Sequence, residues 1–239
     1  MPAPHFIDRY RAILLDVCGT LMFDYDRYGA EVDYFTTYTG LGGKSLPPER
    51  LAHIINQMVQ TIRDAEKVEA NFDPFPSLHD FLLATDGASA LSPEEQRLVE
   101  LVFAHHECGR INAAEVEVVW ALHETHPLGI LSNIWSLTSV FEQELERSGI
   151  RRLIPVRIWS SDLGCIKPAA RIFETALEYF DFPPSQILMV GDTFLRDIYG
   201  AKRMGMATAW INPRNLPLPS KYGVQPDIII RHIGDLLTV

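Results

Sequence analysis

An aspartate near the start of the chain, Asp16, could supply a reactive carboxylate, and Cys18 follows it two residues later. Residues 12–21 (AILLDVCGTL) predict a short buried β-strand that runs into a Gly-Thr turn and leaves the carboxylate exposed at the strand's C-terminal end. Ligands bind at this end of the strands in an open α/β sheet. A carboxylate at such a position could act as a nucleophile, because it is ionised at neutral pH and needs no activating base.

Three further polar groups lie at the ends of predicted core elements. Ser132 and Asn133 end a second predicted strand, Asp192 ends a later one, and Lys167 stands just before a predicted core helix. If the strands are parallel, their C-terminal ends lie at one edge of the sheet, so groups far apart in the sequence converge there. We therefore expect a single site built from these residues and Asp16.

The second half of the chain alternates short apolar runs with amphipathic helices, which is typical of a parallel sheet wound with helices. The predicted strands in this half are 129–132, 156–159, 187–190, 207–211 and 227–230. Between them, Ser139 and Glu142 predict a capping box that opens a helix ended by Gly149. Pro168 predicts the start of another helix.

The chain between the first strand and this alternating half predicts only helices. The expected helices are 30–40, a segment opened by Pro47 and Pro48, 77–85, 93–106 and 112–125. We therefore predict an α/β core of residues 1–22 and 112–239, interrupted by an all-helical insert of residues 23–111. Five aromatic residues of the insert are expected to form its core rather than to contact a substrate: Tyr25, Tyr28, Tyr34, Phe35 and Tyr38.

The composition is that of an ordinary globular protein, with 47% hydrophobic and 22% charged residues in 239. A net charge of -10 argues against nucleic acid or an anionic membrane surface as partner, because either would need a basic stripe. No apolar run approaches the ~18 residues of a membrane span, and the N-terminus lacks the regions of a signal peptide. The three cysteines are odd in number and far apart, which favours a reduced cytoplasmic chain over a disulfide framework.

The polar groups follow the order of the motifs of the haloacid dehalogenase-like hydrolase superfamily, which this chain resembles. The matching motifs are Asp16-x-x-Gly19-Thr20, Leu131-Ser132-Asn133, Lys167-Pro168, and Gly191-Asp192-Thr193 with Asp197 five residues beyond Asp192. Four ordered motifs are far more specific than any one alone. The core resemblance covers residues 11–22 and 112–232, and the insert looks like that family's mobile cap. The resemblance implies a Rossmann-like parallel sheet core with an inserted all-helical cap.

The resemblance also implies a reaction and a metal. Asp16 would attack a phosphorus or carbon centre and carry a covalent intermediate, for which a carboxylate needs no activating base at neutral pH. Asp16 and Asp192 would give hard oxygen ligands to a Mg²⁺ that neutralises the transferring phosphoryl group, with the backbone carbonyl of Cys18 as a third ligand. The expected substrate is a small phosphorylated metabolite. Nothing in the sequence indicates an oligomeric state.

The other motif residues would bind the phosphoryl group or support the nucleophile. Ser132, together with Asn133, would hydrogen-bond the phosphoryl oxygens, while Lys167 would offset the charge of Asp16 and the phosphate. Asp197 would orient Lys167 or a water on the metal. Two loop residues of the first motif complete the implied substrate-binding set: Gly19 and Thr20.

Cys18 departs from the family's phosphatase pattern, which carries an aspartate here as general acid and base. A thiol is a poor donor to an alkoxide and a poor base for water, because its unperturbed pKa is about 8.5. Since positioned proton transfer contributes ~10² to 10⁴ in rate, we expect a slower phosphatase that suffers least with good leaving groups. Asp24 or Asp26, which follow closely, are hypothesised to supply the missing acid.

Other functions remain compatible with these residues. The family's dehalogenase branch uses the same nucleophile without a metal and carries a non-acidic residue two positions later, usually Tyr; Cys18 agrees with that loss of acid. Asp192 argues the other way, since a metal-free site attacking an anionic 2-haloacid has no use for another carboxylate. A catalytically impaired protein that binds phosphate and metal is the second alternative, supported by Cys18 alone. Phosphonate cleavage through a cap lysine would need Lys44 or Lys67 in the site.

Overall fold

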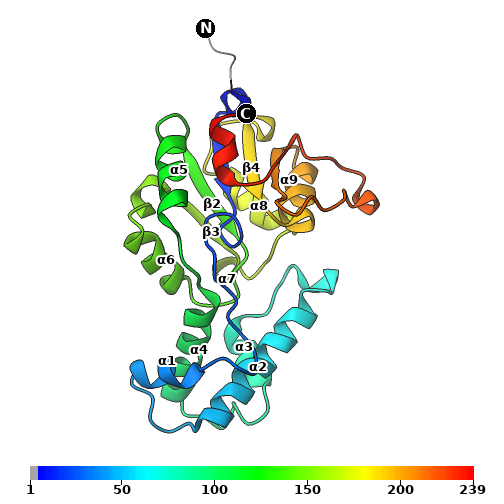
Figure 1. Cartoon of the computed structure of the whole chain (residues 1–239). Helices are drawn as coiled ribbons and strands as arrows, with labels where there is room; N and C mark the ends of the chain where they lie inside the picture. Colours follow the sequence, from blue (N-terminus) through cyan, green and yellow to red (C-terminus); the bar gives the residue numbers. More distant parts are fainter. Residues whose placement is uncertain (1–4) are drawn as a thin grey trace.

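The computed structural model describes residues 5–239 and contains a six-stranded sheet whose neighbouring strands all run parallel (Figure 1). The strand order is β3-β2-β1-β4-β5-β6. The strands are β1 (Ala12–Leu15), β2 (Leu128–Ser132), β3 (Val156–Trp159), β4 (Ile187–Gly191), β5 (Ala207–Ile211) and β6 (Ile228–Ile230). The predicted α/β fold with a Rossmann-like parallel sheet is therefore confirmed.

Helices cover both faces of this sheet (Figure 1). On one face lie α5 (Ala113–His123) and α6 (Thr138–Arg147); on the other lie α8 (Ala170–Leu177) and α9 (Gly200–Arg203), and the short α7 (Ser160–Leu163) follows β3. Successive residues of a strand point to opposite faces. In β1, Ile13 and Leu15 therefore pack with α5 and α6, whereas Ala12 and Leu14 pack with α8 and α9. Both faces are buried, which explains why these strands are nearly continuous apolar runs.

The centre of the sheet is the strand that ends at the predicted nucleophile. β1 pairs with β2 on one side and with β4 on the other, so the chain winds outward in both directions from it. Asp16, Ser132 and Asp192 therefore stand at the carboxyl ends of three neighbouring strands, where the winding reverses. Such a switch point is where ligands bind in open α/β sheets.

The chain between β1 and β2 forms a helical bundle on the far side of these strand ends (Figure 1). Its helices are α1 (Tyr34–Gly40), α2 (Pro48–Ala65), α3 (Leu78–Ala84) and α4 (Pro93–Glu107). They enclose a hydrophobic cluster that Ile166 of the sheet half also joins. The buried face of α2 is the one that its helical spacing predicts: Leu51, Ile54, Ile55, Met58 and Ile62. We propose that this bundle is the cap, with residues 23–111 as its extent.

Two antiparallel hinge segments join the bundle to the sheet: residues 23–27 and residues 106–110, of which the first two also end α4. Phe23 and Arg110 exchange backbone hydrogen bonds of 2.8 and 2.7 Å. The amide of Arg27 donates to the carbonyl of His106 at 2.9 Å, and its guanidinium donates to the carbonyl of Cys108 at 3.0 Å. The two hinge segments are thus paired with each other, so a residue on one of them is positioned by the other.

The predicted capping box of α6 is wrong. The helix begins at Thr138, and no side chain caps it through a hydrogen bond at its N-cap position. Glu142, the expected partner of Ser139, instead accepts hydrogen bonds from Arg157 Nε at 2.7 Å and Trp159 Nε1 at 3.1 Å. Ser139 is therefore the second residue of the helix rather than its N-cap, and Glu142 binds donors of the neighbouring strand β3.

Two predicted helix starts also differ from the structure. α1 begins at Tyr34 rather than at residue 30, because Asp33 accepts a hydrogen bond from the amide of Thr36 and caps the helix there. α8 begins at Ala170, so Pro168 precedes the helix instead of opening it. The other helices and strands lie within a few residues of their predicted bounds.

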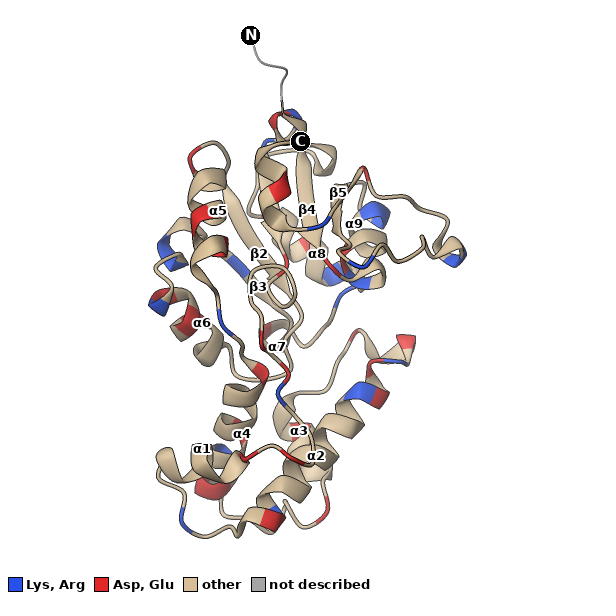
Figure 2. Cartoon of the chain, in the orientation of Figure 1, with Lys and Arg blue, Asp and Glu red and all other residues tan. Residues whose placement is uncertain are grey.

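Acidic and basic residues are spread over both the sheet half and the helical half of the molecule (Figure 2). The 18-residue helix α2 is amphipathic, with one apolar and one charged face. Within residues 5–239, no helix combines the length and the apolar character that a membrane crossing requires.

Candidate active site

Asp16 is the first residue after β1, and the sheet holds it in place. Its amide donates to the carbonyl of Val190 on β4 at 2.9 Å. Its Oδ1 accepts hydrogen bonds from the Ser132 hydroxyl and from Lys167 Nζ, both at 2.8 Å. The side chain is buried. The carboxylate is therefore oriented by groups at the end of β2 and in the loop before α8.

Lys167 is the fixed positive charge of the site. Its ammonium donates to Asp16 Oδ1, to Asp197 Oδ1 at 2.6 Å and to the carbonyl of Leu131 at 2.7 Å. These acceptors use all three ammonium protons. Burial alone would lower the pKa of Lys167, but the charges of Asp16 and Asp197 outweigh burial and raise it. The lysine therefore stays cationic beside Asp16.

Asp197 comes from a π-helical turn, Phe194–Tyr199, that follows β4. Its Oδ1 accepts from Lys167, and its Oδ2 accepts from the amide of Thr193 at 2.9 Å. Burial raises the pKa of Asp197 to about 6; Lys167 opposes this shift and the charge of Asp16 adds to it. A Cβ at Gly191 would lie 2.3 Å from Asp197 Cγ, so glycine is what lets this carboxylate pack against the end of β4. Through its two oxygens, Asp197 thus positions the Lys167 side chain and the loop at Thr193.

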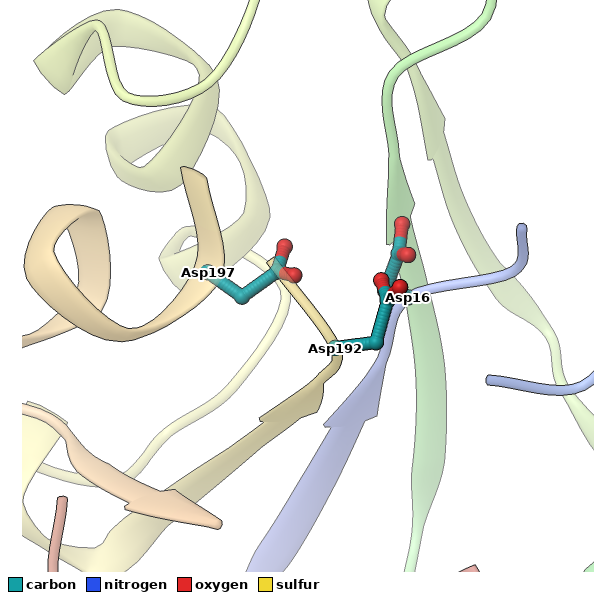
Figure 3. Close-up of side chains that lie close together, drawn as sticks. All are labelled: Asp16, Asp192 and Asp197. Carbon is teal, nitrogen blue, oxygen red and sulfur yellow. The ribbon is translucent and has the colours of Figure 1, made fainter. Parts of the chain in front are cut away.

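Asp192 follows β4 and stands beside Asp16 on the neighbouring strand. Oxygens of Asp16, Asp192 and Asp197 lie within 4.8 Å of one another, and Figure 3 shows the side chains gathered at the strand ends. Burial, followed by the charge of Asp16, raises the pKa of Asp192 to about 7. Its carboxylate accepts a hydrogen bond of 3.2 Å from the hydroxyl of Thr193. The single positive charge of Lys167 does not neutralise the negative charges of these three carboxylates.

The cluster fits a divalent cation. Asp16 and Asp192 offer hard oxygens on adjacent strands, the ligands that Mg²⁺ and Ca²⁺ prefer. Gly19 borders the same pair: its φ is +81°, and a Cβ there would lie 2.5 Å from Asp192 Oδ2. Glycine therefore keeps the space beside that oxygen clear. A cation held here would also offset the repulsion that raises the pKa of Asp192.

Two other predicted residues serve the loops around the site. The side chain of Asn133 brackets the backbone of Lys167: its Nδ2 donates to the lysine carbonyl at 3.2 Å, and its Oδ1 accepts from the lysine amide at 2.8 Å. Asn133 therefore fixes the loop that carries the ammonium. Thr20 is buried, and its hydroxyl has no hydrogen-bond partner among the residues that the structure describes.

A cavity of about 140 Å³ opens at this end of the sheet. Six of the residues proposed from the sequence form part of its wall: Asp16, Cys18, Asp26, Asn133, Lys167 and Asp197. Further wall residues come from the hinge segments and from the segments after β2 and β4: Tyr25, Glu107, Trp135, Thr193 and Arg196. Five of the proposed residues stand outside the wall itself: Gly19, Thr20, Asp24, Ser132 and Asp192. The cavity thus joins groups of the sheet to groups of the helical insert.

Residues 96–211 of this chain match the haloacid dehalogenase-like hydrolase family. The pyrimidine 5'-nucleotidase YjjG of Escherichia coli (strain K12) is 33% identical over 122 residues, which make up 51% of this chain and 52% of that protein. Over about half of its length, the chain is therefore similar to the haloacid dehalogenase-like hydrolases. The match spans about half the length of this curated relative.

Solved structures share the fold of this haloacid dehalogenase-like chain. A 2-haloacid dehalogenase from Pseudomonas syringae pv. Tomato superposes with a TM-score of 0.65 at 21% identity, covering 95% of this chain and 96% of that one. The Bacillus subtilis protein YfnB, in a structure bound to magnesium, superposes with a TM-score of 0.63 at 19% identity, covering 97% of this chain and 100% of that one. These identities are low, so the likeness establishes the fold.

Position 18 of this haloacid dehalogenase-like chain carries a thiol that keeps its proton. Cys18 is only partly buried by surface area. The dense protein around it, and next the charge of Asp16, nevertheless raise its pKa well above the ordinary value. A thiol that stays neutral at physiological pH neither protonates an alkoxide efficiently nor accepts a proton from water. Proton transfer in this cavity would therefore need another group.

Glu107 is a wall residue that sequence reasoning missed. It ends α4 and is 3% exposed; its Oε1 accepts from the amide of Trp135 at 2.5 Å, while its Oε2 has no hydrogen-bond partner in the part of the chain that is described. Burial and the charge of Asp26 raise its pKa to about 8, and Trp135 and Ser136 offset part of the shift. A glutamate at the end of an amphipathic helix resembles any solvated helix residue, so the local sequence gives no signal for this burial.

Arg196 is a second missed wall residue, and it is paired with the insert. Its guanidinium lies 2.8 Å from Glu66 Oε2, and Glu66 Oε1 accepts a hydrogen bond of 2.9 Å from Trp135 Nε1. One carboxylate at the end of α2 therefore holds two residues of the sheet half that face the cavity. The sequence offers no sign of this pairing, because the partners are far apart along the chain.

The aromatic residues of the insert divide between its core and the cavity. Tyr34 and Tyr38 are buried in the helical bundle, and Tyr28 packs against it, as predicted. The prediction was wrong for Tyr25, which lines the cavity, and for Phe35, which is 36% exposed. Tyr25 sits in the first hinge segment before α1, and the pairing of the hinge segments decides its position.

Proposed function

We propose that this protein is a Mg²⁺-dependent phosphatase that hydrolyses a small phosphorylated metabolite through an aspartyl-phosphate on Asp16. The observation that carries the proposal is the carboxylate cluster. The Ser132 hydroxyl and the Lys167 ammonium orient Asp16, and Asp192 stands beside it, with carboxylate oxygens of Asp16, Asp192 and Asp197 within 4.8 Å of one another. The relative named as a nucleotidase and the neighbour bound to magnesium support phosphoester chemistry and a metal. The cavity of about 140 Å³ favours a small substrate.

The proposed reaction has two displacements at phosphorus. An oxygen of Asp16 first bonds to phosphorus, the bond from phosphorus to the ester oxygen breaks, and the leaving oxygen takes up a proton. Water then bonds to phosphorus and gives up a proton, the bond to Asp16 breaks, and inorganic phosphate leaves. Mg²⁺ held by Asp16, Asp192 and the backbone carbonyl of Cys18 would neutralise charge on the phosphoryl group.

Each remaining residue of the sheet half has a positioning or charge role in this proposal. Lys167 and Ser132 both bond to Oδ1 of Asp16, which leaves Oδ2 without a hydrogen bond among the described residues. Lys167 would also offset the charge gathered when phosphate binds, and the Ser132 hydroxyl would hydrogen-bond a phosphoryl oxygen in place of Asp16. Asn133 would act through the loop that it holds, and Asp197 through the ammonium that it shares with Asp16.

The helical insert would close the site. The cavity wall includes Asp26 and Glu107 from the hinge segments as well as Asp16 from the sheet. Closure of the proposed cap of residues 23–111 would exclude water during the first displacement and complete the pocket for the leaving group. Substrate choice would then depend on insert residues such as Tyr25.

The alternatives are weaker on the same observations. A metal-free 2-haloacid dehalogenase agrees with the fold likeness and with Cys18, but Asp192 would place a third carboxylate beside an anionic substrate. Phosphonate cleavage would need a cap lysine, whereas Lys44 is exposed and Lys67 pairs with Asp64 at 2.7 Å outside the cavity wall. A binding protein without turnover keeps the cluster and fails only at proton transfer.

The test measures phosphate release from 4-nitrophenyl phosphate and from ethyl phosphate, with Mg²⁺ or with chelator, for the native protein, Asp16→Asn and Asp192→Asn. We expect metal-dependent turnover in the native protein, and a loss of roughly 10⁴-fold or more in Asp16→Asn because the nucleophile is removed. Asp192→Asn should abolish both turnover and the thermal stabilisation that Mg²⁺ gives to the native protein.

The outcomes separate the candidate functions. Halide release from 2-chloropropionate without metal, lost in Asp16→Asn, would replace the phosphatase by a dehalogenase. Stabilisation by Mg²⁺ and phosphate without turnover, unchanged when Cys18→Asp supplies the usual acid, would establish a binding protein. Phosphate release that persists in Asp16→Asn would refute the proposed nucleophile.

A further inference from the structure

One carboxylate in the cavity wall is not used by the reaction described above and is not held by any neighbour. Asp16, Asp197 and Glu107 each accept at least one hydrogen bond of the protein. The carboxylate of Asp26 accepts none from any residue between 5 and 239, and the side chain is partly exposed. It is therefore free to contact a substrate that fills the cavity.

The backbone places this carboxylate at a cost. Asp26 has a φ of +52°, in the left-handed region that L-residues other than glycine, asparagine and aspartate rarely adopt. Two backbone hydrogen bonds hold this conformation: the amide of Asp26 donates to the carbonyl of Glu107 at the end of α4 at 3.1 Å, and the amide of Tyr28 in the same turn donates to the carbonyl of Asp26 at 2.8 Å. Strained residues that the surroundings hold in place are concentrated at functional sites.

The other candidates for proton transfer fit less well. Asp24 lies in the same turn with a φ of +55°, but it is exposed and stands outside the cavity wall. Glu107 has one oxygen committed to Trp135 and the other fully buried. Burial and the charge of Asp192 raise the pKa of Tyr25, so this phenol holds its proton tightly. Cys18 is a neutral thiol, as described above.

We propose that Asp26 is the general acid and general base of this site and takes over the role that Cys18 cannot fill. The inference rests on the proposed phosphatase function. In the first displacement the carboxyl of Asp26 gives its proton to the leaving ester oxygen. In the second, the carboxylate of Asp26 takes a proton from the attacking water as the bond between phosphorus and Asp16 breaks. The cycle returns Asp16 ionised and Asp26 protonated.

The surroundings of Asp26 suit this double role. Burial raises its pKa to about 6; Arg63 lowers it, Glu66 raises it and Arg196 lowers it. Proton transfer is most efficient when the pKa of the group lies near the working pH, because both protonation states are then accessible. An ordinary exposed aspartate would be ionised almost completely at neutral pH and would make a poor acid.

The experiment compares the native protein, Asp26→Asn, Cys18→Asp and the double variant Cys18→Asp with Asp26→Asn, all with Mg²⁺. Asparagine tolerates the left-handed conformation, so the turn is kept. We expect Asp26→Asn to lower kcat for ethyl phosphate by ~10² to 10⁴. With 4-nitrophenyl phosphate the leaving group needs no proton, so the variant should release a burst of one 4-nitrophenol per site before slow turnover.

Two comparisons distinguish proton transfer from a structural role. Asp24→Asn, the same change in the same turn outside the cavity wall, should keep native rates on both esters. The double variant should regain turnover of ethyl phosphate relative to Asp26→Asn, because Cys18→Asp restores an acid at the usual position. A loss of folding or of Mg²⁺ stabilisation in Asp26→Asn would show in thermal melts and would not be rescued at position 18.

Three results would overturn the inference. Native rates for ethyl phosphate in Asp26→Asn would remove Asp26 from the reaction. Equal losses on both esters without a burst, and without rescue by Cys18→Asp, would make Asp26 a structural residue. Absence of metal-dependent turnover in both the native protein and Cys18→Asp would refute the phosphatase function itself, and the role of Asp26 with it.

Discussion

The carboxylates that the sheet contributes to the cavity are held far more tightly than the one contributed by the first hinge segment. Asp16 and Asp197 are buried and share the ammonium of Lys167, and each has a further donor on the protein. Asp26 is partly exposed, and its carboxylate accepts no hydrogen bond from residues 5–239. The carboxylates of the sheet side are therefore preorganised, whereas the carboxylate of the hinge side is free to reorient.

The helical bundle is nevertheless fastened to the sheet half at a second place. The amide of Ile166 donates to the carbonyl of Phe72 at 2.9 Å, and the amide of Phe75 donates to the carbonyl of Gly164 at 2.8 Å. These contacts lie next to the loop that carries Lys167. Any movement of the bundle that breaks them would thus act on the loop beside Asp16.

The comparison predicts the largest effect for the tightly held side. Lys167→Met leaves Asp16 and Asp197 buried without the ammonium that both now contact. Breaking a buried ion pair from one side costs about 3–5 kcal/mol, so we expect a decrease of that size in the free energy of unfolding and nearly complete loss of turnover. Denaturant titration and phosphate release measure the two quantities.

A second substitution tests whether charge is the cause. Adding Asp197→Asn to Lys167→Met removes one of the two uncompensated charges and should recover part of the lost stability, although turnover should stay absent. If the single and double variants unfold at the same denaturant concentration, packing rather than charge holds the cluster. The carboxylates of the sheet would then not owe their tight placement to Lys167.

The tightly held side is also the side that the sequence predicts. Asp16, Ser132 and Asp192 follow apolar runs that can only be buried strands, and parallel strands bring their ends together. Lys167 is located by its motif beside the proline before a helix. The position of these residues depends on local patterns and on one rule of topology. Predicting it therefore required no knowledge of the insert.

The hinge side could not be predicted in the same way. The burial of Glu107 and the free carboxylate of Asp26 follow from the pairing of two segments that are about eighty residues apart, through contacts such as Phe23 with Arg110. No periodicity marks such a pairing. The contact of Asn133 with the backbone of Lys167 was not predicted for a related reason, because the two residues lie in loops that are far apart along the chain.

The next prediction concerns the space beside Asp192. In Gly19→Ala the new Cβ would lie 2.5 Å from Asp192 Oδ2, and alanine would be strained at a φ of +81°. We expect the affinity for Mg²⁺ to fall by ~10- to 100-fold, the range seen when the surroundings of a metal ligand are disturbed. Calorimetric titration with Mg²⁺ measures this change.

Gly149→Ala is the matched control. Its φ is +79°, but no atom lies within 4 Å of the added Cβ, so it carries the backbone strain without the contact. It should lose about 1 kcal/mol of stability and keep the native Mg²⁺ affinity. A similar loss of affinity in both variants would show that strain, rather than crowding of Asp192, weakens the site.

The third prediction concerns pH. The pKa of Asp192 is raised to about 7, so this carboxyl keeps its proton in the folded metal-free protein over a range where the unfolded chain has lost it. From about pH 4 to 7, therefore, its contribution to the stability of the metal-free protein falls as pH rises. Because a metal ligand must be ionised, stabilisation by Mg²⁺ should grow over the same range.

Thermal melts at pH 5.5 and pH 8, with and without Mg²⁺, measure this dependence. The shift in melting temperature caused by Mg²⁺ should be larger at pH 8, and Asp192→Asn should remove the shift at both values. A Mg²⁺ shift of equal size at both pH values would mean that Asp192 is already ionised at pH 5.5 and does not repel Asp16 as strongly as their proximity implies.

The smallest expected effect belongs to the contacts between the insert and the cavity. Glu66→Gln keeps an acceptor for the indole of Trp135 but removes the negative charge facing Arg196. We expect a loss of roughly 1 kcal/mol in the free energy of unfolding and a severalfold decrease in kcat/KM, because Arg196 and Trp135 both line the cavity. Asp73→Asn breaks the exposed pair with Arg171 and serves as control, with a stability change of less than about 1 kcal/mol and native kinetics.

The difference in kcat/KM between Glu66→Gln and Asp73→Asn shows how the hinge side is held. Both remove a charge that pairs the insert with the sheet half, but only Glu66 contacts residues of the cavity wall. A decrease in kcat/KM confined to Glu66→Gln would show that the loosely held side depends on local contacts near the substrate. An equal decrease in Asp73→Asn would show instead that the placement of the whole bundle sets the cavity, and Asp26 would then be positioned by the cap as a unit.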